Sequence, residues 1–127
     1  MVIIDTNIII DHLRQKNRKV SWLQKMTEGA EATKIAISVV SIQELYTGKS
    51  ISTLENEETM LNTIASYEIK SYSYEIAKKA GELVRNSNGQ LQFADAAIAA
   101  TAIVNDAQLA TLNKKDFEDI KDLVLFK

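Results

Sequence analysis

Four acidic side chains in this sequence of 127 residues stand where their carboxylates could do chemistry. Each follows a short apolar segment or lies in the first turns of an expected helix, and they are Asp5, Glu44, Asp95 and Asp116. Each position also suits a structural role, because carboxylates cap helices and are favoured in a first helical turn. Ser41-Ile42-Gln43-Glu44, for example, matches a capping box. Taken singly, each acid is explained more simply by capping than by a site.

The surroundings of these acids weaken the capping explanation when all four are considered together. Asp5 ends an apolar strand, Glu44 lies in a mostly apolar helix, and Asp95 opens a helix with almost no other polar residue. Burying a carboxylate among apolar side chains is costly unless its charge is compensated. Converging carboxylates also repel and raise one another's pKa values, unless a divalent cation neutralises them. Mg²⁺ prefers oxygen ligands and keeps reactive waters, so the four acids are predicted to hold one or two such ions.

The elements that must position these acids alternate between strand and helix along the chain. Short apolar or β-branched runs predict strands at 2–4, 35–37, 68–72, 109–112 and 123–126. Helical spacing predicts helices at 8–14, 20–29, 39–46, 52–64, 74–88 and 94–102, with a helical turn or loop at 113–120. This order predicts an α/β fold in one domain over residues 1–127: a central parallel sheet of about five strands with helices on both faces. Ligands bind such sheets beyond the carboxyl ends of the strands, which is where the acids are placed.

The composition bounds the partners that this chain can use. It has 17 Asp and Glu against 15 Lys and Arg, a formal net charge of −2, and no cysteine. The absence of cysteine excludes disulfides, thiol catalysis and cysteine-ligated zinc. The charge argues against binding nucleic acid through bulk positive potential, so such binding needs local basic clusters or bound cations. If four of the 17 acids hold cations, 13 acids remain against 15 Lys and Arg. The surface outside the site is then expected to be mildly basic.

No segment of the sequence predicts secretion or membrane insertion. The N-terminus reaches Asp5 after a run of only three apolar residues, which is unlike a signal peptide. The longest run of small and apolar residues, 93–104, contains Asp95 and is shorter than the roughly 20 residues that span a bilayer. We therefore expect a soluble cytoplasmic protein that does not associate with membranes.

Four motifs occur in order along essentially the whole chain. They are VIIDTN at 2–7, SVVSIQEL at 38–45, DAAIAATA at 95–102 and LATLNKKDF at 109–117. Each motif alone is short and unspecific. Together, at this spacing, they resemble the PIN-domain ribonucleases, in particular the VapC-type toxins of type II toxin–antitoxin pairs. The resemblance implies a three-layer PIN-like fold over residues 1–127.

The resemblance also implies what the site does. The metal-binding acids of the family match Asp5, Glu44, Asp95 and Asp116, the residues already singled out at the strand ends. The polar positions that line the same pocket match Thr6, Thr111 and Asn113. The implied reaction is Mg²⁺- or Mn²⁺-dependent hydrolysis of phosphodiesters in single-stranded or looped RNA of the tRNA or rRNA class, leaving a 5′-phosphate and a 3′-hydroxyl. A cognate antitoxin and a homodimer are implied in the same way.

Two basic clusters could meet the phosphates of such an RNA. One consists of Lys16, Arg18 and Lys19, and the other of Lys114 and Lys115. Such runs are often only solvated surface, but contact with phosphates would make RNA binding sensitive to salt. Lys114 and Lys115 are the better placed of the two clusters, because they adjoin a predicted metal ligand.

Other functions fit parts of the pattern less well. A phospho-receiver domain is also α/β and rich in acids at strand ends, but its middle strand needs an acceptor aspartate, and the third strand here is followed by Ser73. A PIN fold could also serve as a non-catalytic module that binds nucleic acid or protein, although the presence of all four acids favours a nuclease.

The segment 47–50 resembles the end of a P-loop, but Gln43 stands where its first glycine belongs. Trp22 is expected in the core or at an interface rather than as a platform for bases.

Overall fold

The structure, a computed structural model, describes residues 1–15, 20–28 and 34–127. Its centre is a sheet of five parallel strands in the order β3-β2-β1-β4-β5. The strands are β1 (Val2–Ile4), β2 (Ile35–Ser38), β3 (Glu68–Lys70), β4 (Gln108–Ala110) and β5 (Val124–Leu125). All five predicted strands are therefore present, and the parallel sheet is confirmed.

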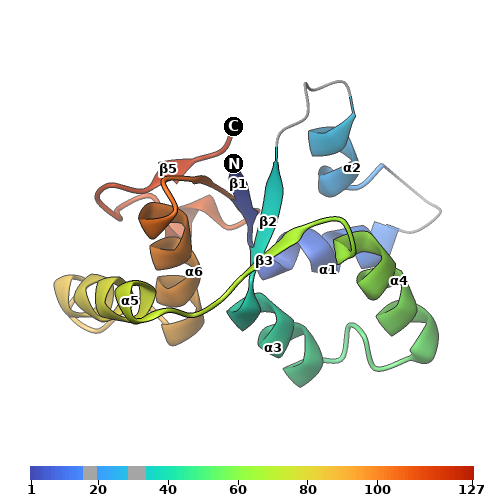
Figure 1. The fold of residues 1–127 in the computed structure, drawn as a ribbon, viewed down its shortest axis with the longest axis horizontal. Coiled ribbons are helices and arrows are strands. Elements are labelled where there is room, and N and C mark those ends of the chain that lie inside the picture. Colours follow the sequence, from blue (N-terminus) through green and yellow to red (C-terminus); the bar gives the residue numbers. More distant parts are fainter. Residues whose placement is uncertain (16–19, 29–33) are drawn as a thin grey trace.

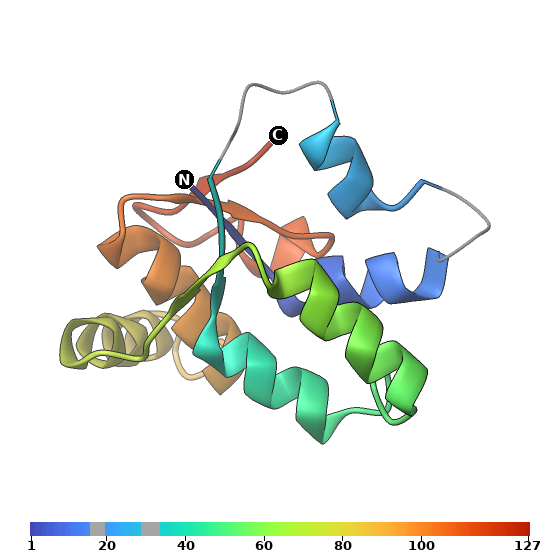
Figure 2. The same cartoon turned by 45° about the vertical axis from the view of Figure 1, so that its right-hand side comes forward.

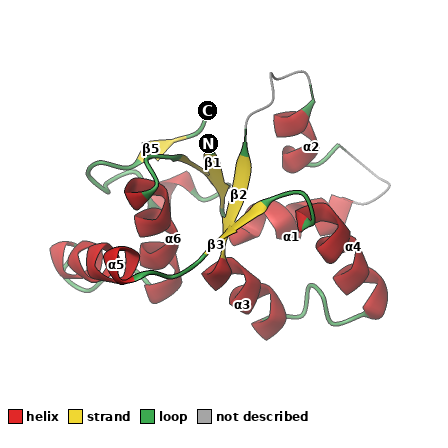
Figure 3. Ribbon diagram, in the orientation of Figure 1, coloured by secondary structure: helices red, strands yellow, loops and turns green. Residues whose placement is uncertain are grey.

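Helices cover both faces of this sheet. They are α1 (Thr6–Gln15), α2 (Trp22–Thr27), α3 (Val39–Thr47), α4 (Leu54–Ile64), α5 (Tyr74–Asn86) and α6 (Phe93–Val104), with a short 3₁₀ turn η1 (Lys114–Asp116). Figure 1 shows α5 and α6 to one side of the sheet and α1 to α4 to the other, and the turned view in Figure 2 keeps this separation. Figure 3 shows the strands as a layer between the two groups of helices, which confirms the predicted three-layer α/β fold. None of the helices in the described part of the chain is long and apolar enough to cross a bilayer.

Alternate residues of the short strands supply two cores, one on each face. Val2 and Ile4 of β1 belong to a cluster with residues of α1, α2, α3 and α4, whereas Ile3 belongs to a cluster with residues of α5 and α6. All three side chains are buried, as expected of a parallel strand covered on both faces. The facing residues of α6 between Ala96 and Ala102 are mostly alanine and buried, so this helix can pack closely against the sheet.

The topology brings the ends of several elements to one edge of the sheet. The chain runs from β1 to β2 and β3 on one side, and then crosses to β4 and β5 on the other. The order therefore reverses between β1 and β4, which is where α/β sheets bind ligands. The helices α1 and α3 begin directly after β1 and β2 at the carboxyl edge. Because α6 leads into β4, it runs antiparallel to the strands, and its N-terminus reaches the same edge.

Candidate active site at the carboxyl edge of the sheet

Asp5 lies at the centre of this edge, directly after β1. Its side chain is buried, with 5% of the residue exposed. Oδ1 accepts a hydrogen bond from the amide of Thr6 at 2.7 Å, and Oδ2 accepts one from the hydroxyl of Thr111 at 2.8 Å. Since Thr111 follows β4, the second of these bonds joins the ends of the two strands between which the strand order reverses. Both carboxylate oxygens are thus held by the protein, and the orientation of the group is fixed.

Glu44 reaches the same edge from the second turn of α3. Its Oε1 accepts a hydrogen bond from the hydroxyl of Thr6 at 2.6 Å, and that hydroxyl is also bonded to the Oγ of buried Ser41 at 2.9 Å. The capping box suggested for Ser41 and Glu44 is wrong. Ser38 caps α3 instead, accepting from the amide of Val40, because it ends β2 in extended conformation while Ser41 is already helical. Glu44 is therefore free to face Thr6 and the end of β1.

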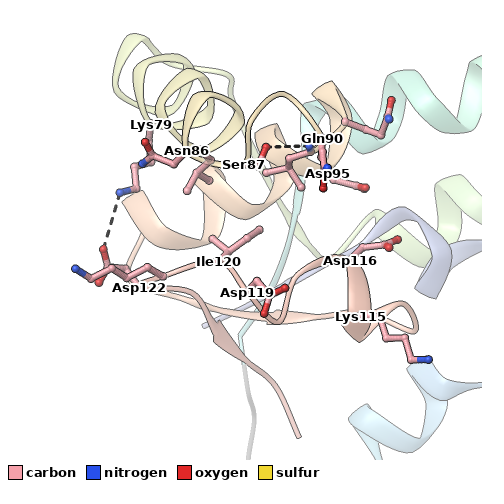
Figure 4. Close-up of a pocket in the computed structure, with 14 residues that line it drawn as sticks. Lys79, Asn86, Ser87, Gln90, Asp95, Lys115, Asp116, Asp119, Ile120 and Asp122 are labelled. Carbon is pink, nitrogen blue, oxygen red and sulfur yellow. Dashed lines mark hydrogen bonds and ion pairs between the residues drawn. The ribbon is translucent and has the colours of Figure 1, made fainter.

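Asp95 and Asp116 border the site on its other side. Asp95 lies half-buried in the first turn of α6, and the cap position of that helix is Gln92, so Asp95 does not act as a cap. The helix dipole favours its negative charge there. Asp116 ends η1 and is exposed. Both line a cavity of about 610 Å³ between α5, the loop after it and the loop before β5 (Figure 4).

The four acids affect one another electrostatically. Burial raises the pKa of Asp5, and the charges of Glu44 and Asp116 raise it further, while the hydrogen bonds from Thr111 and Thr6 lower it. Burial, followed by the charges of Asp5, Asp116 and Glu44, raises the pKa of Asp95 to about 6. The four carboxylates thus lie near enough for their charges to interact, and together they make a negatively charged region that is costly to ionise fully without a counter-charge.

The acids approach one another without forming a ligand shell in this structure. Among the described residues, no three acidic or histidine side chains lie close enough to hold one metal ion together. The hydrogen bonds explain part of this spacing, because Thr111 and Thr6 hold Asp5 and Glu44 toward the protein. Mutual repulsion between the carboxylates acts in the same direction.

The raised pKa of Asp95 predicts how the metal-free protein responds to pH. An aspartate in an unfolded chain has a pKa near 3.9, against about 6 here, so the folded state binds this proton more tightly. The resulting stability is present below about pH 4 and is lost as the pH rises through 6. With EDTA at pH 7.5, Asp95→Asn should therefore melt higher than the wild type, by about 4 °C for roughly 1 kcal/mol after solvent screening. Thermal unfolding measured at pH 4.5 and 7.5 checks this, and an equal difference at both values would contradict it.

Two residues that the sequence reasoning did not assign to the site help to build it. Asn7 donates from Nδ2 to the hydroxyl oxygen of Thr111 at 3.3 Å and accepts from the amide of Leu112 at 3.2 Å. It thereby fastens the loop after β4 onto α1. Ser41 supports Thr6, as described above. Asn7 stands two positions after Asp5 in the first motif. Its place as a polar residue just past a strand end was the one sequence feature that could have marked it as part of the site.

The remaining predicted residues are placed as follows. Asn113 contributes its backbone amide, which donates to the Thr111 hydroxyl oxygen at 3.0 Å, while its exposed side chain makes no capping bond to η1. Lys114 and Lys115 are exposed and line a second cavity together with Thr111. The other predicted basic cluster, 16–19, lies outside the described residues.

Comparisons with known proteins agree with this arrangement. The profile of the PIN domain matches residues 2–123. The chain is 35% identical over 126 residues to "Ribonuclease VapC10" of Mycobacterium tuberculosis, covering 97% of this chain and 90% of that protein. It is 32% identical over 123 residues to "Ribonuclease VapC19" of the same organism, covering 97% of each.

Solved structures are similar over the same extent. The structure of VapBC2 from Rickettsia felis, bound to a DNA fragment from its promoter, contains a chain with 27% identity and a TM-score of 0.83, covering 99% of this chain and 98% of that one. A toxin–antitoxin complex from Klebsiella pneumoniae gives 27% identity and a TM-score of 0.76, covering 98% and 96%. The chain belongs to the PIN-domain family and is of the VapC type.

Proposed function

We propose that this chain is a metal-dependent endoribonuclease, with Asp5, Glu44, Asp95 and Asp116 as its catalytic and metal-binding acids. The observation that carries the proposal is the pair of hydrogen bonds by which Thr111 and Thr6 hold Asp5 and Glu44 at the switch point of the sheet. Asp95 lies within electrostatic range of both, and Asp116 lies within range of Asp5 and Asp95. The relatives named ribonuclease support the same reaction class.

The side chains present suit a hard divalent cation such as Mg²⁺ or Mn²⁺. All four donors are carboxylates, and burial, followed by the neighbouring negative charges, raises the pKa values of Asp5 and Asp95, so a cation would stabilise their ionised forms. Binding one or two ions requires the acids to draw together from the positions that they occupy here. When bound, the cation lowers the pKa of water and stabilises the charge that develops on the phosphate.

The protein itself fixes and positions the site. Thr111 and Thr6 orient the carboxylates, and Asn7 keeps Thr111 in place. Histidine has no part in the proposed chemistry, because the single histidine, His12, is hydrogen-bonded to Ser21 Oγ at the start of α2. Hydrolysis of RNA by the purified protein, dependent on Mg²⁺ or Mn²⁺, tests the proposal. The non-catalytic module and the receiver domain are favoured by no observation at this site.

The hydroxyl of Thr111 offers a graded test of this positioning. Thr111→Val removes the bond to Asp5 Oδ2 while nearly keeping the shape of the side chain, and we expect cleavage to fall about tenfold to a hundredfold. Thr111→Ser keeps a hydroxyl and should remain within about threefold of the wild type. Initial rates on one labelled RNA, compared for the three proteins, make the measurement. Equal losses in the valine and serine variants would show that the hydroxyl is not what matters.

We also propose that the chain is the toxin of a pair and binds a cognate antitoxin in the cytoplasm, acting on tRNA or rRNA as a homodimer. Two of the similar solved structures, VapBC2 from Rickettsia felis and a toxin–antitoxin complex from Klebsiella pneumoniae, support this partner. Co-expression with the product of the adjacent gene, followed by affinity purification, tests the partner. Light scattering of the isolated chain tests the dimer.

A further inference from the structure

A second cavity, which we call the Trp22 cavity, adjoins the acids on the side away from α5. It measures about 450 Å³ and is lined by Trp22, Thr111, Leu112, Asn113, Lys114 and Lys115. Among the described residues, two lysines and no carboxylate line it, and neither lysine makes an ion pair with any of them. Thr111 forms part of its wall and donates to Asp5 Oδ2 at 2.8 Å. The cavity is therefore connected to Asp5 through the side chain of Thr111.

Trp22 is held in place by the fold. Its amide donates to Asp11 Oδ2 at 2.9 Å, and the preceding Ser21 forms a capping box with Gln24 at the start of α2. The side chain is half-buried: it packs against the core on the α1–α4 side and also lines the cavity. The sequence predicts Trp22 in the core or at an interface rather than as a platform for bases, and the structure places it against the core while also leaving it on the cavity wall. An aromatic ring fixed beforehand loses little conformational freedom when a ligand stacks on it.

The loop that forms the rest of the wall is also anchored. Asn7 accepts from the amide of Leu112 at 3.2 Å, and the Thr111 hydroxyl accepts from the amide of Asn113 at 3.0 Å. The side chain of Leu112 is left partly exposed, at 41%. The cavity therefore combines an aromatic ring, an apolar side chain and two lysines that form no ion pair within the described part of the chain, all on an anchored backbone.

The two cavities beside the acids differ in charge. The larger one is lined by three lysines and four aspartates, a net charge of −1, whereas the Trp22 cavity carries +2. Lys115 lines both, and Figure 4 shows its side chain pointing away from Asp95 toward the pale-blue helix α2. A polyanion that crosses the acids is thus attracted toward Trp22 rather than toward α5. Aromatic rings beside cations are how proteins bind single-stranded nucleic acid.

We propose that the Trp22 cavity binds a nucleotide of single-stranded RNA next to the scissile phosphate. Its base stacks on the indole of Trp22, and its phosphate is bound by Lys114 and Lys115. The inference rests on the proposed ribonuclease function and adds the subsite that selects an unpaired strand. A duplex is disfavoured, because its bases are already stacked and paired and cannot reach the indole.

The single tryptophan of the chain makes a direct measurement possible. The Asp5→Asn protein, titrated in Mg²⁺ with a six-nucleotide single-stranded RNA, should show quenching of its Trp22 fluorescence, and a duplex of the same sequence should bind at least about tenfold more weakly. Anisotropy of a labelled strand should give about a tenfold loss for Trp22→Leu, with most of the affinity kept in Trp22→Phe. Lys114→Gln and Lys115→Gln should each reduce the salt slope of binding by about 0.7.

The possible outcomes distinguish failure of the Trp22 subsite from failure of the proposed ribonuclease function. If the wild type cleaves RNA but the strand leaves the fluorescence unchanged, and Trp22→Leu keeps the wild-type KM, the subsite is wrong and the ribonuclease stands. Should Trp22→Leu fail to fold, the fluorescence and the two lysine variants still decide. Quenching by a co-expressed antitoxin but not by RNA would assign the cavity to a protein partner and overturn the inference. Absence of both RNA binding and cleavage would overturn the inference together with the proposed function.

Discussion

Asp5→Asn is expected to lower the rate of metal-dependent RNA cleavage at least about a thousandfold while leaving the protein folded. Asn has the shape of Asp, and its amide oxygen can still accept from the amide of Thr6, so the local structure should persist. What disappears is the charge at the centre of the edge. Asp95→Asn should have a comparable effect. The kcat/KM of each variant on one labelled RNA, measured beside its thermal unfolding curve, gives the result.

An aspartate of the same cavity provides the matched control. Asp119 is exposed, lines the larger cavity beside Asp95 and Asp116, and is not one of the four proposed ligands. Asp119→Asn removes the same charge from the same region and should stay within about twofold of the wild type, since an exposed charge has little effect at a distance in salt. A loss in Asp119→Asn as large as in Asp5→Asn would mean that overall charge, rather than four particular ligands, governs activity.

Divalent cations are expected to stabilise the protein strongly. A ligand that binds only the folded state at a hundred times its Kd adds about 2.7 kcal/mol, which for a chain of this size raises the melting temperature by about 10 °C. The pKa values of Asp5 and Asp95 are raised first by burial and then by the neighbouring carboxylates, and a bound cation would offset both costs of ionising these groups. Differential scanning fluorimetry across a Mn²⁺ or Mg²⁺ titration measures it.

Two controls test whether the stabilisation comes from a specific cation site. NaCl at matched ionic strength screens the charges without occupying the site, so its shift should be small. Asp95→Asn starts from a higher melting temperature without metal and lacks one ligand, and its shift with Mn²⁺ should be less than half that of the wild type. Equal shifts in NaCl and MnCl₂, or in the two proteins, would rule out a specific cation site built from these acids.

Much of this fold follows from local patterns in the chain. The β-branched run Val2–Ile4 is buried on both faces, and the alanine-rich segment after Asp95 packs closely against the sheet, as their compositions indicate. Because helices that begin after parallel strands start at the carboxyl edge, the sequence alone predicts Asp5 and Glu44 at the same edge. Strand ends were less well predicted. The strands predicted at 109–112 and 68–72 extend beyond the C-terminal ends of β4 and β3. The observed strands end at Ala110 and Lys70, and Thr111 and Ser71 are no longer part of the sheet.

The features that escaped prediction depend on contacts between distant parts of the chain. Ser38 and Ser41 both suit a helix cap, and only the end of β2 decides that Ser38 takes the role. Asn7 and Thr111 are 104 positions apart, and their contact requires β1 and β4 to be neighbours. The two-sided placement of Trp22 similarly depends on how α2 meets the loop after β4. None of these three features can be predicted from the residues near it in the sequence.

The most direct test of the proposed site is the cleavage of a 3′-labelled RNA with a 5′-hydroxyl end by the purified chain in EDTA, Mg²⁺ and Mn²⁺, with the chemistry of the new ends determined. We expect cleavage only with a divalent cation, and new 5′-phosphates that make the downstream fragment sensitive to a 5′-phosphate-dependent exonuclease. Contaminating metal-independent nucleases leave 3′-phosphates or cyclic phosphates, so the ends distinguish them. Cleavage that proceeds equally in EDTA, or fragments without a 5′-phosphate, would contradict hydrolysis at a cation held by Asp5, Glu44, Asp95 and Asp116.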